Sequence, residues 1–330
     1  MLRFVSFTNI MFGKELSACR LNSLSFWSVV VLALKKDKVL IKPPVESLVG
    51  EVNCAVVRLE LAGEYRGYGR LYEAATARRG VVYLHGIQSH GGWFLQSCDF
   101  LRDAGHTVLA PDRRGSGLNQ QDRGDCAGAG QLIEDVDRSV EWLRGQGGFD
   151  RVDLVAVSWG GKLALVYAGR YPEKVRSVVL VAPGLCARVD ISLREKIAVG
   201  AHGLVGPRKL HEIPLNDPEL FTQTPQMIKF IAGDPLKLTG ATARFLLTSA
   251  RLDSLVQKTV GKLKIPIYLF LAERDRIIDN AATIKLLAGV LRPVSETGEN
   301  WRMYEGAHHT LEFETRRETF FEEMARCLKE

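Results

Sequence analysis

The sequence predicts an α/β fold built around a mostly parallel sheet. Short apolar runs alternate along the chain with longer segments whose apolar residues recur at helical spacing. Apolar strands separated by helices are typical of a parallel sheet, because each parallel strand needs a crossover connection to the next. The chain has 330 residues, 46% hydrophobic and 25% charged. It is therefore long enough for one large core with an inserted subdomain.

Eight strands and their helices are predicted in order after the Pro43-Pro44 pair. Segments 54–61 and 69–75 alternate between apolar and polar residues, which predicts two antiparallel strands joined by a glycine-containing turn. Apolar strands and amphipathic helices then alternate to the end of the chain. The six later strands are predicted at 81–86, 106–112, 152–157, 175–183, 265–272 and 301–306, and the helices at 91–105, 129–147, directly after Ser158, 280–291 and 318–328.

One interval breaks this alternation and predicts a helical cap. Between Pro183 and Ile265 no strand of the sheet is evident, and three segments have helical periodicity: 192–205, 225–233 and 239–261. The insertion follows the sixth strand, at the edge of the sheet where ligands bind in open α/β folds. We therefore expect a core formed by residues 49–184 and 264–330, with residues 185–263 as a cap or lid.

Residues 1–48 form a predicted N-terminal extension whose role the sequence does not indicate. Its apolar run, Leu24 to Leu34, is shorter than the roughly 18–20 residues that span a bilayer, and no signal cleavage site follows it. We expect an amphipathic or disordered segment of a cytoplasmic protein. A membrane-surface anchor, a lipid-uptake surface and a translation start placed too far upstream are the alternatives.

Charge and cysteine spacing exclude several classes of function. The net charge is +6, but the basic residues are scattered and no aromatic-interleaved basic stripe occurs, so we expect no nucleic-acid partner. The six cysteines lie far apart without a C-x-x-C pair. This spacing favours reduced thiols over a disulfide framework or a zinc site.

Ser158 is the predicted nucleophile. A buried strand leads directly into it, a helix follows at once, and small residues stand two positions before and after it, Ala156 and Gly160. This pattern is typical of a nucleophile elbow, although Ala156 replaces the usual first glycine. The amide of Trp159, at the start of the helix, would donate to an oxyanion.

A second oxyanion donor is predicted in the loop after the third strand. The sequence there reads "LHGIQSHGGW", and the amide of Ile87 follows the His85-Gly86 pair. On its own, such a pair indicates only a tight turn. Here the pair follows the first strand after the two antiparallel strands and precedes the predicted elbow at Ser158. This position favours an oxyanion hole.

The sequence also supplies an acid and a base in the order that such folds use. Asp275 follows the strand at 265–272, while Asp279 directly precedes a helical segment and is expected to cap it. Asp275 is therefore the predicted acid, with Asp279 as the alternative. Two adjacent histidines, His308 and His309, follow the last strand, and spacing alone does not separate them.

Together these motifs resemble the α/β-hydrolase superfamily, and most closely serine hydrolases of the monoacylglycerol lipase and lysophospholipase type. The resemblance covers roughly residues 50–330 and rests on "YLHGIQSHGGW", "VLAPDRRGSGLN", "VAVSWGGKLAL", "LAERDRIIDN" and "YEGAHHTLEFE", with "IAGDPLKLTGATARFL" in the cap. It implies an eight-stranded sheet, a catalytic His309 and Asp275, and no cofactor or metal. The implied substrate is a small-molecule ester or lipid. Trp159 occupies a position where this family often has methionine. A tryptophan at this position is more similar to members of the proline iminopeptidase type.

Three functions follow from these observations. The first is a carboxylic ester hydrolase that forms an acyl-enzyme on Ser158, with peripheral contact to a lipid surface. The second is an amidase or iminopeptidase, which would need an acidic group such as Glu212 or Glu219 for a free amine. The third is a non-catalytic binding protein, which a complete Ser158, Asp275 and His309 set argues against.

Overall fold

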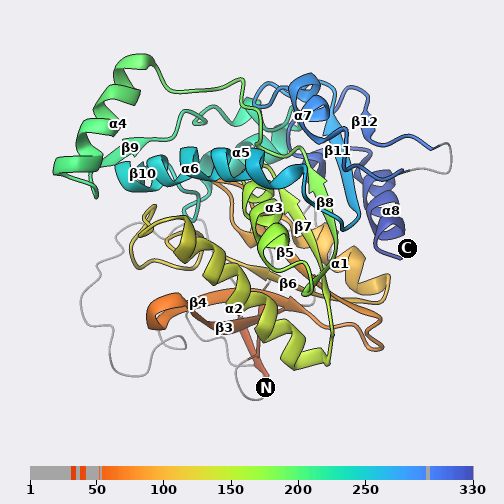
Figure 1. Ribbon diagram of the computed structural model, residues 1–330. Coiled ribbons are helices and arrows are strands. Elements are labelled where there is room, and N and C mark those ends of the chain that lie inside the picture. Colours follow the sequence, from red (N-terminus) through yellow and green to blue (C-terminus); the bar gives the residue numbers. More distant parts are fainter. Residues whose placement is uncertain (1–30, 35–37, 42–51, 53, 295–297, 330) are drawn as a thin grey trace.

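The computed structural model describes residues 31–34, 38–41, 52, 54–294 and 298–329, and within them it contains one large sheet flanked by helices (Figure 1). The strand order is β1-β2-β3-β4-β6-β5-β7-β8-β11-β12. Strands β5 to β8, β11 and β12 pair in parallel, while β4 runs antiparallel to β6 at one side. The predicted α/β fold with a mostly parallel sheet is confirmed.

The predicted strands form close to their expected positions. The second one begins four residues earlier than expected, at Tyr65, because the turn before it is a single helical turn with Gly63 at φ +65°. Two further strands, β1 and β2, extend the antiparallel side, so that the sheet has ten strands in the described residues. The strands are β1 (Val31–Leu34), β2 (Lys38–Ile41), β3 (Ala55–Leu61), β4 (Tyr65–Tyr72), β5 (Arg79–Leu84), β6 (His106–Pro111), β7 (Val152–Val157), β8 (Val175–Val181), β11 (Ile267–Ala272) and β12 (Arg302–Tyr304).

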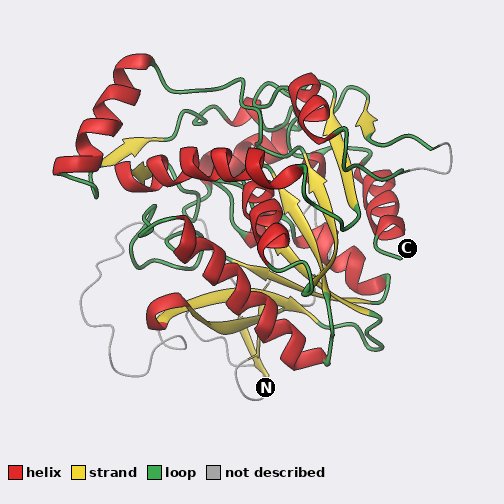
Figure 2. Cartoon of the chain, in the orientation of Figure 1, coloured by secondary structure: helices red, strands yellow, loops and turns green. Residues whose placement is uncertain are grey.

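Helices cover both faces of this sheet, as the cartoon in Figure 2 shows. On one face α2 packs on α3, β3 and β5, and on the other α1 packs on β6 and on α8. These core helices, together with α7 beside the cap, are α1 (Leu95–Asp103), α2 (Ala129–Gly147), α3 (Gly160–Arg170), α7 (Asn280–Leu287) and α8 (Arg317–Cys327). Because β6, β7 and β11 are buried along their whole length, the sheet forms the centre of the core.

The order of the strands places a crevice beside Ser158. The chain leaves β5 in one direction to reach β6 and then crosses back over β5 to β7, so the connections on either side of β5 lie on opposite faces. Such a switch in direction opens a crevice at the carboxyl ends of the two strands. The loop at Gly86 and Ile87 follows β5, and Ser158 follows β7.

The inserted segment lies over the carboxyl ends of the strands (Figure 1). It contains α4 (Leu193–Val205), α5 (Pro225–Gly233) and α6 (Ala243–Val260), which match the predicted helices. A short antiparallel pair, β9 (Leu210–Glu212) with β10 (Gly240–Thr242), was not predicted because three residues are too few for an alternating pattern. Residues 185–263 are called the cap below.

The predicted N-terminal extension lies mostly outside the described residues. Its described parts, β1 and β2, pair with one another, and Leu40 pairs with Ala55 of β3. The apolar run at 24–34 therefore ends in a strand. Among the described helices, none combines the length and the apolarity that crossing a bilayer requires.

Candidate active site

Ser158 stands at a sharp turn between β7 and α3. Its backbone has φ +52°, in the left-handed region that costs a non-glycine residue about 1–3 kcal/mol. Backbone hydrogen bonds hold this conformation: the Ser158 amide donates to Val181 at 3.0 Å, and its carbonyl accepts from Gly161 at 3.0 Å and Gly184 at 2.7 Å. A strained serine fixed between a strand and a helix has the backbone geometry of a nucleophile elbow.

The small residues around Ser158 are required by close backbone approach. A Cβ atom at Gly160 would lie 2.6 Å from the carbonyl oxygen of Leu84 and 2.7 Å from that of His85. Ala156 is fully buried in β7, where it pairs with Leu84 of β5 and with Leu180 of β8, and the turn at Ser158 forms with its methyl group in place. The missing glycine of the motif thus leaves the turn intact.

His309 and Asp275 meet beneath the surface at the same edge of the sheet. The Nδ1 atom of His309 lies 2.7 Å from Oδ2 of Asp275, and both side chains are buried. The other carboxylate oxygen of Asp275 accepts from the amides of Ile277 at 2.8 Å and Ile278 at 3.0 Å, so its orientation is fixed. Within the described residues the Nε2 atom of His309 is buried without a hydrogen-bond partner. This nitrogen is the atom that a serine hydroxyl would use.

The two alternative residues are engaged elsewhere. Asp279 caps α7, as predicted, by accepting from the amide of Ala282 at 2.9 Å. The Nδ1 atom of His308 lies 3.3 Å from a carboxylate oxygen of Glu314. Asp275 and His309 are thus the pair that the structure brings together.

The loop after β5 runs directly beside Ser158. A Cβ atom at Gly86 would lie 3.2 Å from Cβ and 3.5 Å from Oγ of Ser158. Within the described residues, the amides of Ile87 and Trp159 have no hydrogen-bond acceptor. Two unpaired N–H groups on the loops next to a serine are what an oxyanion hole requires.

Buried aromatic side chains of the cap lie over these residues. Phe245 of α6 stacks on Trp159 with ring centroids 5.3 Å apart, and Phe221 meets the His309 ring edge-on at 5.9 Å. Phe230 contacts Trp93 of the core at 6.0 Å. Phe230 and Phe245 lie on the cap side that faces the core aromatic residues.

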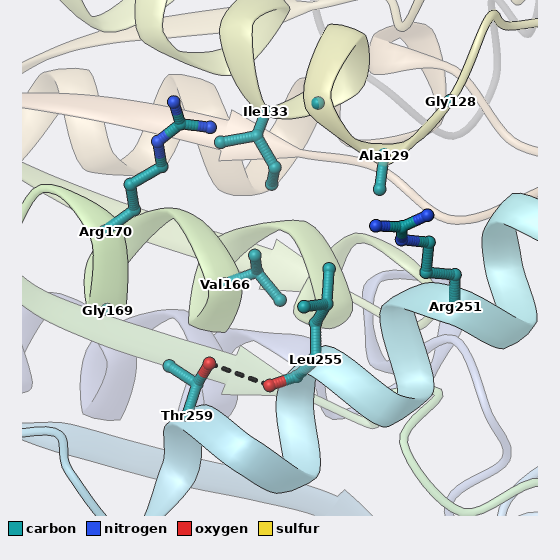
Figure 3. Close-up of a pocket in the computed structure, with 10 residues that line it drawn as sticks. Gly128, Ala129, Ile133, Val166, Gly169, Arg170, Arg251, Leu255 and Thr259 are labelled. Carbon is teal, nitrogen blue, oxygen red and sulfur yellow. Dashed lines mark hydrogen bonds between the residues drawn. The ribbon is translucent and has the colours of Figure 1, made fainter.

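A separate hollow of about 530 Å³ lies between α2, α3 and α6. Figure 3 shows the Arg170 and Arg251 side chains extending toward it from α3 and α6, above Val166 and Leu255. It contains none of the predicted site residues. In the described part of the chain, no cluster of three or more His, Cys, Asp or Glu side chains is placed to hold a metal ion.

Comparisons with known proteins identify the family of this chain. The family model "Serine aminopeptidase, S33" (Hydrolase_4) matches residues 75–316. The chain belongs to this family. It is 24% identical over 246 residues to phospholipase YtpA of Bacillus subtilis, which covers 73% of this chain and 91% of that protein. It is 27% identical over 247 residues to the monoacylglycerol lipase of Mycolicibacterium smegmatis, covering 72% and 83%.

A solved structure shares the fold. The monoacylglycerol lipase of Paleococcus ferrophilus superposes with a TM-score of 0.70 at 22% identity, over 79% of this chain and 98% of that one. The α/β-hydrolase fold and the predicted resemblance to monoacylglycerol lipase-like hydrolases are therefore confirmed.

One residue of the site was missed by the sequence analysis. Arg113 follows β6 and donates hydrogen bonds to the carbonyls of Gly86 and Ile87. The sequence offers a weak signal for it, the first arginine of "DRRG", which comes shortly after a strand. Nothing local indicates that this arginine turns inward toward the loop after β5.

Proposed function

We propose that this protein is a carboxylic ester hydrolase that forms an acyl-enzyme on Ser158. The observation that carries the proposal is the buried hydrogen bond between His309 and Asp275, which leaves the Nε2 atom of His309 without a partner among the described residues. Ser158, strained and at the same edge of the sheet, supplies the hydroxyl group. Membership of a serine hydrolase family supports the same assignment.

The proposed reaction has two acyl-transfer steps. His309 takes the proton of Ser158 while the hydroxyl oxygen attacks the ester carbonyl, and Asp275 stabilises the imidazolium that forms. The amides of Ile87 and Trp159 stabilise the oxyanion. His309 then protonates the departing alcohol, and water repeats the steps on the acyl-enzyme.

The substrate is proposed to carry an apolar acyl chain. Phe245 and Phe221 lie over Trp159 and His309, and they offer an apolar surface next to the reacting atoms. The outer side of the cap also exposes large apolar residues, which favours action at a lipid surface. These include Leu193, which is 74% exposed, together with Ile197, Leu204 and Val205. The named activities of the two relatives, a phospholipase and a monoacylglycerol lipase, support a glycerolipid-like ester.

An aminopeptidase is the second candidate, because the matching family is described by that activity. Recognition of a free amine needs a buried carboxylate close to the serine. Glu212 and Glu219, the cap residues considered for this role, are both exposed to solvent. Their exposure favours the ester hydrolase over the aminopeptidase.

The test compares esters and an amide on one preparation. The purified protein receives p-nitrophenyl esters of increasing chain length and Pro-p-nitroanilide, with Ser158→Ala as the control variant. We expect hydrolysis of the esters, fluorophosphonate labelling of Ser158, and loss of both in the variant. Cleavage of the anilide alone would favour the aminopeptidase. The absence of both activity and labelling would refute the proposal that the protein is an enzyme acting through Ser158.

A further inference from the structure

Arg113 is buried without an anionic partner. It is 8% exposed, and its neighbours Arg70 and Arg114 are equally buried but each pairs with a carboxylate, Asp112 and Asp135 respectively. Among the described residues, Arg113 has no such ion pair. Burial lowers the pKa of Arg113 to about 10. A buried cation without a counter-ion is costly, so its position calls for an explanation beyond packing.

The Arg113 guanidinium group binds two consecutive carbonyls of the loop after β5. Its Nη1 atom donates to the oxygen of Gly86 at 2.9 Å, and its Nη2 atom donates to that of Ile87 at 2.8 Å. In a trans peptide, a carbonyl and the following N–H point to opposite sides. Because the Gly86 carbonyl is held toward Arg113, the Ile87 amide is turned away from it. Arg113 thereby sets the direction of one oxyanion donor.

His85 reinforces the same arrangement. The amide of Arg113 donates to the Nε2 atom of His85 at 2.8 Å, so the proton of the neutral ring resides on Nδ1, which donates to the Gly86 carbonyl at 2.8 Å. Burial, followed by the charge of Arg113, lowers the pKa of His85 to about 3. The ring is therefore neutral over the physiological range, and this hydrogen-bond pattern does not change with pH there.

The same guanidinium group also contacts the second donor residue and the cap. It lies 4.8 Å from the centroid of the Trp159 ring and 5.3 Å from that of Phe245 on α6. These two rings stack on each other, and the Trp159 indole N–H donates to Ser249 of α6 at 2.8 Å. One cation thus touches the loop of Ile87, the side chain of Trp159 and the cap. Cation–π contacts of a desolvated guanidinium are among the stronger ones.

We propose that Arg113 is a positioning residue that holds the oxyanion hole in its active geometry and couples it to cap helix α6. The inference rests on the proposed acyl transfer at Ser158 but assigns a role to a residue outside the Ser158, His309 and Asp275 set. Arg113 contacts the carbonyl side of the loop, so it acts through the amide of Ile87 and not on the substrate itself.

The test replaces Arg113 with methionine, which keeps the apolar stem and removes the hydrogen-bond donors. Losing one oxyanion donor typically costs on the order of a hundredfold or more in kcat. We expect a loss of that order with KM changed by only a few-fold. Inhibition by a trifluoromethyl ketone, whose adduct with Ser158 carries an oxyanion, should weaken in parallel. Arg113→Lys retains the charge but lacks the paired N–H donors of a guanidinium group, so its kcat should lie between those of Arg113→Met and the wild type.

Arg123 offers a matched control. It is a partly buried arginine in the same loop that also donates only to carbonyls, those of Gly117, Leu236 and Lys237, and it touches neither donor residue. Arg123→Met should lower the melting temperature, but it should not cause the selective loss of kcat at nearly constant KM that is expected for Arg113→Met. Added guanidinium ion, below the unfolding concentration, should restore part of the activity of Arg113→Ala and none to Arg123→Ala.

The coupling to the cap is measured with Phe245→Leu. If Arg113 links α6 to the oxyanion hole, the double variant with Arg113→Met should lose less kcat than the product of the single losses. Strict additivity would refute the link to the cap. Unchanged kcat and ketone affinity in both Arg113→Met and Arg113→Lys would refute the positioning role, while wild-type turnover and labelling of Ser158 would still stand. An inactive, unlabelled wild type would instead refute the proposed function.

Discussion

Replacing Gly160 by alanine tests the elbow most directly, because the structure leaves no space for one methyl group there. The new Cβ atom would lie 2.6 Å from the Leu84 carbonyl oxygen and 2.7 Å from that of His85. Ordinary contact begins at 3.4 Å, so the start of α3 and the end of β5 must separate by about 0.8 Å. Both obstacles are backbone atoms, which cannot rotate away as a side chain does.

The expected cost has two parts. Overpacking of a tight site destabilises proteins by about 1–3 kcal/mol, which urea unfolding measures as a lower midpoint. The same displacement moves the amide of Trp159 relative to Ser158, and a misplacement of about 1 Å costs on the order of a hundredfold in rate. We therefore expect kcat for a p-nitrophenyl ester to fall by about that factor.

Gly145→Ala is the matched control for this variant. Gly145 lies inside α2 with nothing within 4 Å of its added Cβ atom. Alanine there should raise the free energy of unfolding by about 0.5–1 kcal/mol and leave hydrolysis unchanged. If Gly160→Ala were as stable and as active as the wild type, the close approach of α3 to β5 would be wrong.

Two further predictions concern the loop after β12. His309→Ala should reduce kcat by on the order of 10⁴-fold or more, whereas His308→Ala should stay within about tenfold of wild type; the opposite result in the ester assay would reverse the assignment. The second prediction concerns the pH dependence of stability at Glu312. Burial raises the pKa of its carboxyl from 4.5 to about 7, although hydrogen bonds from Ser97 and from the Gln96 amide lower it. The folded state then holds more protons on this group than the unfolded state between these values, so the contribution of Glu312 to stability is greatest below about pH 4.5 and falls by about 3 kcal/mol as pH rises to about 7. Glu312→Gln should abolish that slope in unfolding measured from pH 4.5 to 8, and an unaltered slope would assign it to other groups.

Most of the fold could be predicted from the sequence because its signals are local. The helix at 129–147 forms over the predicted residues, since its apolar stripe is long and regular. Asp279 was recognised as a helix cap from its place before a helical segment alone. The short cap strands β9 and β10 carried no such pattern, and they exist because they pair with each other across 27 intervening residues (213 to 239).

The sequence by itself determined the order of the elements, the serine turn after β7, and the loops in which an acid and a histidine would stand. Spacing left His308 and His309 equivalent, because adjacent residues in a loop have nearly the same spacing to everything before them, and only the family resemblance pointed to His309. The tertiary structure separated them: the ring of His309 meets Asp275, which lies in the loop after β11 and 34 residues earlier in the chain, and the ring of His308 lies against Glu314. It also placed Arg113 against the carbonyls of Gly86 and Ile87, a contact between the ends of neighbouring strands that no local pattern encodes.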